Sequence, residues 1–147
     1  WILSIINAFV AVSGFVLLYF VKKHISKGNY AIIWAMNFTI LMVVGVLIFG
    51  FLKVEYIALF GFLFFSISRE GTYPLLDTIL LKNTPSEIKA TVLSGFGQLD
   101  AIGQLLSGAL MVTISVFFGL QGVYLVTAVL LLAPVFLFTT IIRQKSN

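Results

Sequence analysis

Residues 30–52 read YAIIWAMNFTILMVVGVLIFGFL, a run in which Asn37 and Thr39 are the only clearly polar side chains. A helix needs about 20 consecutive apolar residues to cross a bilayer core that is roughly 30 Å thick. A strand of a membrane barrel would instead alternate in polarity over about ten residues. The stretch therefore predicts a membrane-spanning helix.

Similar apolar segments flank this stretch on both sides. We expect membrane helices at about 1–21, 30–52, 56–81, 85–118 and 122–142, followed by a short tail at 143–147. The connections between them are short, so that neighbouring helices must be antiparallel. The chain is 61% hydrophobic and only 10% charged, whereas a soluble domain has about 25% charged residues. The fold class predicted is an all-α, polytopic membrane helix bundle.

The residue inventory excludes several kinds of chemistry. The chain has no cysteine and one histidine, which rules out disulfides and thiolate metal sites. It offers no paired catalytic or metal-binding constellation, so we expect neither an enzyme nor a cofactor. The net charge of +4 is explained by where the basic residues fall, and we expect a lipid bilayer rather than a nucleic acid as partner.

The basic residues predict how the chain is oriented in the membrane. Lysine and arginine are retained on the cytoplasmic side of membrane proteins. One side of this bundle would hold only Lys53, and the other would hold Lys22, Lys23, Lys27, Lys82, Lys89, Arg143 and Lys145. We therefore expect a multi-pass protein of the cell membrane with a cytoplasmic C-terminus. Because Trp1 already lies inside an apolar run, we also expect the chain to be part of a longer protein.

The third helix carries charged residues at mid-depth. Arg69 lies 14 residues after Glu55 and 13 before Lys82, or about 20 Å from either end at about 1.5 Å per residue. A charged side chain at the bilayer centre costs about 2.5–3.5 kcal/mol or more. We therefore expect Arg69 and Glu70 to face a water-accessible substrate or proton pathway. The alternative is a structural pair that locks two helices together.

The fourth helix carries a second polar group at similar depth. Asp100 and Gln104 share one face at helical spacing, and Gln98 lies one turn or less away. We expect these residues in the same pathway, with Asp100 as an acidic partner of Arg69 and with Glu70 or Asp100 as a proton acceptor. The alternative is that they hydrogen bond between helices.

Two local features are expected to shape the cytoplasmic half of the third helix. Pro74 removes one helical hydrogen bond and Gly71 weakens the same turn, which predicts a kink there. Asp77 lies five residues before Lys82, near the cytoplasmic rim, where it would act as a gate or an interfacial anchor.

The start of the fourth helix fits a capping box at residues 84–87, TPSE. In that motif Thr84 would accept from the backbone N–H of Glu87, and Pro85 would occupy the first helical position.

Residues 68–108 resemble transporters of the major facilitator superfamily, in particular bacterial drug-efflux-like members. The resemblance is carried by Arg69, by Asn83 before a short loop, and by KATVLS at 89–94. The family commonly has arginine in place of Lys89, and the connection at 22–29 lacks the acidic residue of the family's loop signature.

This resemblance implies a partial fold and a function. The chain would be the last five of twelve helices, the C-terminal half of a transporter whose N-terminal half is missing here. Its first, third and fourth helices would line a central cavity, and its second and fifth would face lipid. Alternating access would move a small molecule, with proton-coupled efflux expected and Lys89 at a gate. The alternatives are uptake of a small metabolite or sugar, and a non-transporting membrane assembly subunit.

Overall fold

The computed structural model describes residues 1–25 and 30–146, apart from the side chains of residues 2, 3, 18, 20–25, 145 and 146. These residues form helices α1 (Ile2–Ile25), α2 (Tyr30–Phe51), α3 (Glu55–Lys82), η1 (Ser86–Ile88) and α4 (Lys89–Ser146), with no strand among them. The all-α class predicted from composition is confirmed. Much of the basic charge used above to predict orientation, on Lys22, Lys23, Lys27 and Lys145, lies outside the described side chains.

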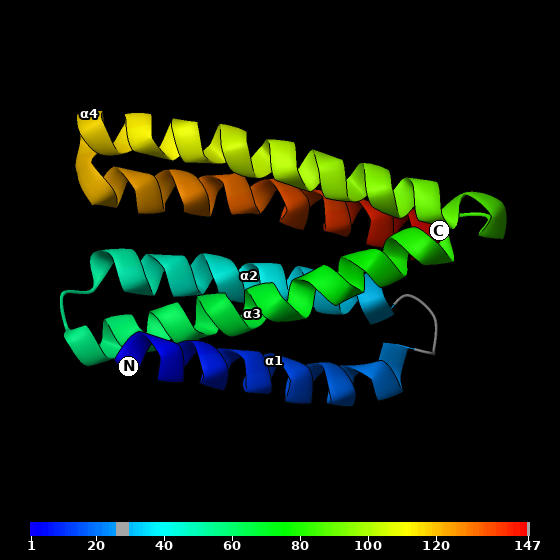
Figure 1. Ribbon diagram of the computed structural model, residues 1–147, viewed down its shortest axis with the longest axis horizontal. Helices are drawn as coiled ribbons and strands as arrows, with labels where there is room; N and C mark the ends of the chain where they lie inside the picture. Colours follow the sequence, from blue (N-terminus) through cyan, green and yellow to red (C-terminus); the bar gives the residue numbers. More distant parts are fainter. Residues whose placement is uncertain (26–29, 147) are drawn as a thin grey trace.

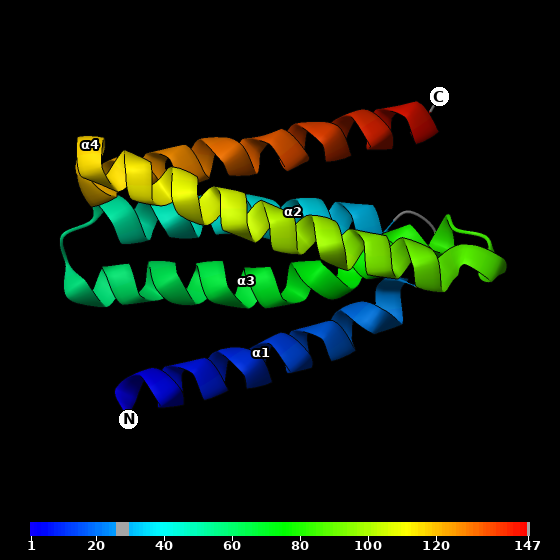
Figure 2. The same cartoon turned by 45° about the horizontal axis from the view of Figure 1, so that its top comes forward.

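The helices lie roughly parallel or antiparallel to one another (Figure 1). α2 packs along α3 on one side and along α4 on the other, while α1 packs mainly against α3. The view in Figure 2 shows the same order, with α1 at the outside of the bundle and α2 between α3 and the returning part of α4. α2 is thus the centre of the described bundle.

Glycine allows α2 and α3 to approach closely. A Cβ at Gly45 would lie 2.7 Å from both the Gly61 carbonyl oxygen and the Phe65 backbone nitrogen. A Cβ at Gly61 would lie 2.6 Å from the backbone nitrogen of Phe49. No real Cβ tolerates such distances, so the two backbones meet where neither carries a side chain, as membrane helices commonly do.

α4 contains a complete reversal of direction. The element spans Lys89–Ser146 and consists of two helices that meet at Gly119, whose φ of 67° and ψ of −174° are not helical and are essentially restricted to glycine. The first arm (residues 89–118) runs to one end of the bundle and the second arm (residues 120–146) returns beside it (Figure 1). The expected helices at 85–118 and 122–142 correspond to these arms, and the connection between them is reduced to one residue.

The apolar surface of the chain remains largely uncovered. By length and hydropathy, two helices of the described residues could cross a membrane: α2 and the segment Ser86–Gln144, which includes both arms of α4. In the most apolar 18-residue stretch of that segment, only 6% is buried inside the fold. An apolar surface of this size requires lipid or further protein to cover it, in agreement with a membrane helix bundle. The expected number of five spans stays a prediction.

The expected capping box at the start of α4 is not formed. The Thr84 hydroxyl donates to the Leu80 carbonyl at 2.7 Å, so it extends the hydrogen bonding of α3. Pro85 adopts extended backbone angles, φ −56° and ψ 145°, and it makes no side-chain cap. The chain enters α4 through the 3₁₀ turn η1 instead, because a hydroxyl can bond backward to a carbonyl as readily as forward to an N–H.

Candidate functional site

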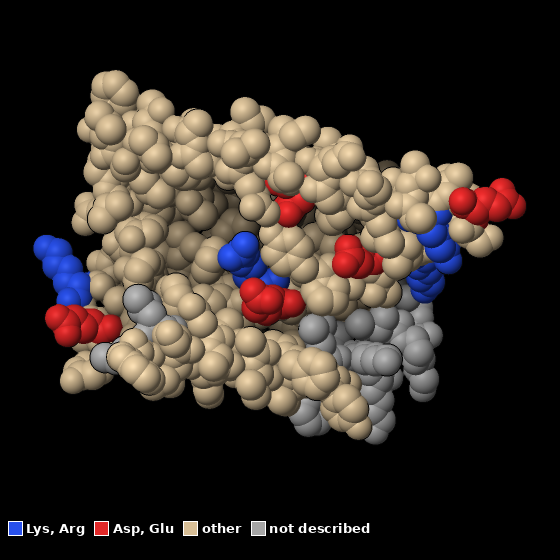
Figure 3. Space-filling view, viewed as in Figure 1, with Lys and Arg blue, Asp and Glu red and all other residues tan. Residues whose placement is uncertain are grey.

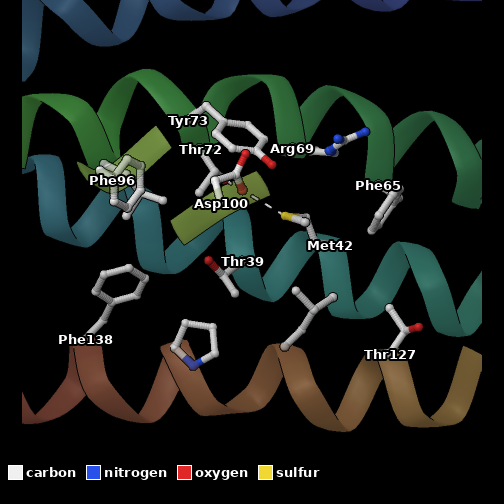
Figure 4. A pocket seen from close by; sticks show the side chains of 13 residues that line it. Thr39, Met42, Phe65, Arg69, Thr72, Tyr73, Phe96, Asp100, Thr127 and Phe138 are labelled. Atoms are coloured by element: carbon white, nitrogen blue, oxygen red, sulfur yellow. Dashed lines mark hydrogen bonds between the residues drawn. The ribbon is translucent and has the colours of Figure 1, made fainter. Parts of the chain in front are cut away.

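A cavity of about 340 Å³ lies between α2, α3 and both arms of α4. Figure 4 shows the side chains that line it. They are Thr39, Met42, Phe65, Arg69, Thr72, Tyr73, Leu76, Phe96, Asp100, Thr127, Leu131, Pro134 and Phe138. The lining is mostly apolar, and its two charged members come from facing segments, α3 and the first arm of α4.

Arg69 enters the cavity from α3. Its Cζ atom lies 5.8 Å from the centre of the Tyr73 ring, a cation–π distance. Within the described part of the chain, this ring contact is the side-chain interaction that Arg69 makes, and no ion pair to it is formed. Figure 3 shows basic and acidic atoms together in the middle of this face, over α3 and beside a hollow in the surface.

Asp100 enters the same cavity from the first arm of α4. Its Oδ2 atom accepts a hydrogen bond of 2.8 Å from the Gln104 side-chain amide, one turn further along the helix. The expected ion pair between Asp100 and Arg69 is not formed, since among the described interactions the carboxylate is held by a neutral amide. The two residues nevertheless line one cavity, as their similar depth predicted.

Glu70 points away from the cavity. A Cβ at Gly14 of α1 would lie 3.0 Å from the Glu70 Cβ, which places Glu70 on the side of α3 that faces α1. Glu70 is absent from the cavity lining, although its side chain is exposed. Arg69 and Glu70 therefore lie on two different faces of α3, because neighbouring residues of a helix point about 100° apart.

The remaining predicted site residues lie outside the cavity. Gln98 and Lys89 are exposed on the first arm of α4, Asp77 is half-buried on α3, and Pro74 is exposed. α3 stays helical through Pro74, whose carbonyl accepts from the Thr78 hydroxyl at 2.7 Å. The structure brings Arg69, Asp100 and Gln104 together, and it leaves the other predicted residues apart from them.

Gly71 is buried against α2. A Cβ at this position would lie 3.0–3.4 Å from the ring of Phe38. Phe38 belongs to the buried cluster that also contains Ala31, Ala35 and Leu75. Gly71 therefore allows a large aromatic ring to pack closely against α3, which is a packing role. Its proposed contribution to a helix kink stays a prediction.

Three threonines that were not among the predicted site residues also line the cavity. Thr39 donates to the Ala35 carbonyl, Thr72 to the Ser68 carbonyl and Thr127 to the Val123 carbonyl, each at 2.8 Å. The resemblance implies that the second and fifth helices face lipid, whereas Thr39 and Thr127 of these helices line the cavity. α2 and the second arm of α4 thus contribute to the cavity wall.

A second, smaller cavity of about 240 Å³ adjoins the first along the same helices. Phe65 and Thr127 line both cavities, and the Phe49 and Tyr124 rings meet edge to face at 5.3 Å beside the second. Among the described residues, no group of three histidine or acidic side chains is arranged to hold a metal ion.

Comparison with known proteins supports one family. Over 75 residues the chain is 37% identical to the uncharacterized MFS-type transporter YxaM of Bacillus subtilis (strain 168). The aligned stretch is 51% of this chain and 19% of the Bacillus protein, so it represents about a fifth of that relative. No family model matches the chain, and no solved structure matches it. The similarity supports membership of the major facilitator superfamily.

Proposed function

We propose that the chain forms part of a secondary transporter of the major facilitator superfamily, which moves a small molecule across the cell membrane by alternating access. The observation that carries the proposal is the cavity between α2, α3 and α4, which holds Arg69 and Asp100 inside an apolar bundle. Charged groups that lack an ion pair within a bilayer require water or a polar ligand. A transport pathway supplies both.

The exposed first arm of α4 fits this proposal. Residues 101–110 are exposed along their whole length, and the glycines at 95, 97, 103 and 108 have open space where a Cβ would be. Small residues allow close helix approach in membranes. In the proposed transporter, this face contacts helices that belong to the rest of the protein.

Asp100 is the better candidate for proton coupling. It lines the cavity with Arg69, whereas Glu70 lies toward α1. A carboxylate at this depth is easier to enclose in a dry, closed state when it is protonated, because desolvating the charged form is costly. Alternating protonation of Asp100 would therefore favour closure in one form and opening in the other.

Efflux is the direction that the drug-efflux-like resemblance supports, and uptake of a small metabolite or sugar is the alternative. A non-transporting assembly subunit would be expected to pair Arg69 tightly inside the bundle. Within the described residues Arg69 has no ion pair, which favours transport over assembly.

Reconstitution of the complete gene product into lipid vesicles tests the proposal. With an imposed pH gradient and a set of chemically diverse compounds, we expect gradient-driven movement of at least one compound. Asp100→Asn should abolish the dependence on the gradient, because the amide cannot take up a proton.

Two acid variants distinguish the coupling site from a general loss of charge. Glu55→Gln, at the start of α3 and outside the cavity, should retain coupled transport and serves as the control. Loss of coupling in Glu70→Gln with coupling intact in Asp100→Asn would assign the proton to the α1-facing surface instead. Absence of movement for every compound, in a folded protein, would refute transport.

A further inference from the structure

The cavity is lined by two opposite charges that form no ion pair with each other. Arg69 contacts the Tyr73 ring, and Asp100 is held by the Gln104 amide, while no ion pair joins the two. Both charges nevertheless line the same space of about 340 Å³. A ligand with one charged group would compensate one of them and leave the other as it is.

The walls between these charges are apolar and aromatic. Phe65, Tyr73, Phe96 and Phe138 come from α3 and from both arms of α4 (Figure 4). Small-molecule sites are typically pockets of about 300–1,000 Å³, with mostly hydrophobic walls and a few polar groups that fix orientation. The cavity fits a molecule with a compact apolar body.

We propose that this cavity binds an amphoteric organic molecule, with an acidic group held by Arg69, a basic group held by Asp100 and an apolar body between the rings. Its role as a transported substrate rests on the proposed function, whereas binding stands on the geometry of the cavity. The guanidinium offers a planar pair of N–H donors that matches a carboxylate.

The threonine hydroxyls reinforce this polarity. Thr39, Thr72 and Thr127 each donate their hydroxyl hydrogen to a carbonyl of their own helix. The Thr72 and Thr127 hydroxyls also lie 4.0 Å and 3.8 Å from the sulfur atoms of Met42 and Met111. While its hydrogen is engaged with the carbonyl, each hydroxyl oxygen is left to accept in the cavity. They can share an ammonium group with Asp100, and they leave Arg69 as the main donor for an acidic group.

Proton coupling follows from the same arrangement. The titratable side chains that line the cavity are Arg69 and Tyr73 from α3 and Asp100 from α4, and the described lining residues of α2 add none. A proton on Asp100 removes the charge that holds the ligand's basic group. Proton and substrate therefore compete for one carboxylate, which produces exchange of one for the other.

Three matched probes test the proposal by equilibrium dialysis against the complete gene product in detergent. L-Phenylalanine carries both charges, 3-phenylpropanoate lacks the amine, and phenethylamine lacks the carboxylate. We expect phenylalanine to bind roughly 10-fold or more tightly than either singly charged probe, since a hydrogen bond to a charged group is worth about 1.5–3 kcal/mol.

Cavity variants assign each charge to its partner. Arg69→Gln should weaken phenylalanine and 3-phenylpropanoate roughly 10- to 100-fold and leave phenethylamine unchanged. Asp100→Asn should weaken phenylalanine and phenethylamine to a similar extent and spare 3-phenylpropanoate. Arg143→Gln and Glu87→Gln, which lie outside the cavity lining, should leave all three probes unchanged. Arg69→Lys should recover part of the loss, which also shows that the position tolerates substitution.

Any other ranking overturns the proposal. Binding of the acid or the amine as tightly as phenylalanine would make the cavity a site for a single charge, and no binding of the three probes would exclude this class of ligand. Since dialysis requires no gradient, binding without transport would refute the proposed function alone.

Discussion

Thr127 is the residue through which access to the cavity can be measured most directly. It is half-buried, lines both cavities and comes from the second arm of α4, whereas Arg69 lines the first cavity from α3. Since the chain has no cysteine, an introduced thiol reports without background.

We expect Thr127→Cys to react with a charged, membrane-impermeant methanethiosulfonate reagent. If water solvates Arg69 and Asp100, the reagent can diffuse through that water into the cavity. Val44→Cys is the control, because Val44 is 44% exposed on the outer face of α2 and would lie in lipid. Mass spectrometry gives the labelling rate of each introduced cysteine. If Thr127→Cys were labelled as slowly as Val44→Cys, the cavity would not be filled with water.

At the residue scale, the sequence indicated the charged members of the site but not their neighbours. Arg69, Asp100 and Gln104 stand out because charge and amide are costly in an apolar helix. Thr39 and Thr127 do not, because a threonine hydroxyl is satisfied by its own helix and is tolerated on any face. The absence of an Arg69–Asp100 ion pair depends on side-chain directions that spacing alone does not fix.

Among the elements, α2 and α3 approach each other backbone to backbone. It depends on Gly45 and Gly61, each of which has the other's carbonyl within 2.8 Å of its missing Cβ. The contact also lies beside Phe65, which lines the cavity.

We expect Gly45→Ala and Gly61→Ala each to destabilise the protein by about 1–3 kcal/mol, the usual cost of overpacking. Both added methyl groups would meet backbone atoms, which cannot move aside. Val44→Ala is the control, since Val44 is 44% exposed on the same helix as Gly45 and the change removes methyl groups instead of adding one. Thermal unfolding in detergent measures the difference, and unchanged midpoints for the first two would show that the helices lie further apart.

The reversal of α4 makes a separate prediction at Gly119. An L-residue rarely adopts φ 67° with ψ −174°, and forcing it there costs on the order of 1–3 kcal/mol. We expect Gly119→Ala to lower the unfolding midpoint accordingly. Val129→Ala, at a position that is 57% exposed in a helical part of the same element, should change the midpoint little, so a similar loss in both variants would contradict the assigned turn.

Element ends were the least predictable part of the chain. The sequence at 84–87 has the residues of a capping box, yet the Thr84 hydroxyl bonds back to Leu80. Asn83 does the same, with its amide donating to the Ile79 carbonyl at 2.7 Å. Both side chains can serve either helix, and only the path of the loop decides between them.

For the molecule as a whole, the all-α class followed from composition, because so apolar a chain has few ways to satisfy its backbone in lipid. The packing order did not follow. α2 carries almost no polar residues, yet it lies at the centre of the described bundle and has the buried residues Ala35, Phe38 and Thr39. An apolar helix suits a protein interior as well as a lipid surface, so polarity alone does not place it.

The orientation of the protein in the membrane is a property of the whole molecule and can be tested separately. The link between α3 and α4 and the C-terminus lie at one end of the bundle, and the link between α2 and α3 lies at the other (Figure 1). In intact cells, we expect an impermeant thiol reagent to label Lys53→Cys but not Asn83→Cys. Permeabilised cells serve as the control, and labelling of Asn83→Cys alone would invert the predicted orientation.

The single-residue turn at Gly119 joins two helices that both contribute to the cavity wall. Asp100 stands on one limb of this hairpin, and Thr127, Pro134 and Phe138 stand on the other. Because one glycine joins the two arms, a change in its two backbone torsion angles would change the angle between them. Such a change would move Asp100 relative to Thr127, Pro134 and Phe138, although Gly119 itself does not line the cavity.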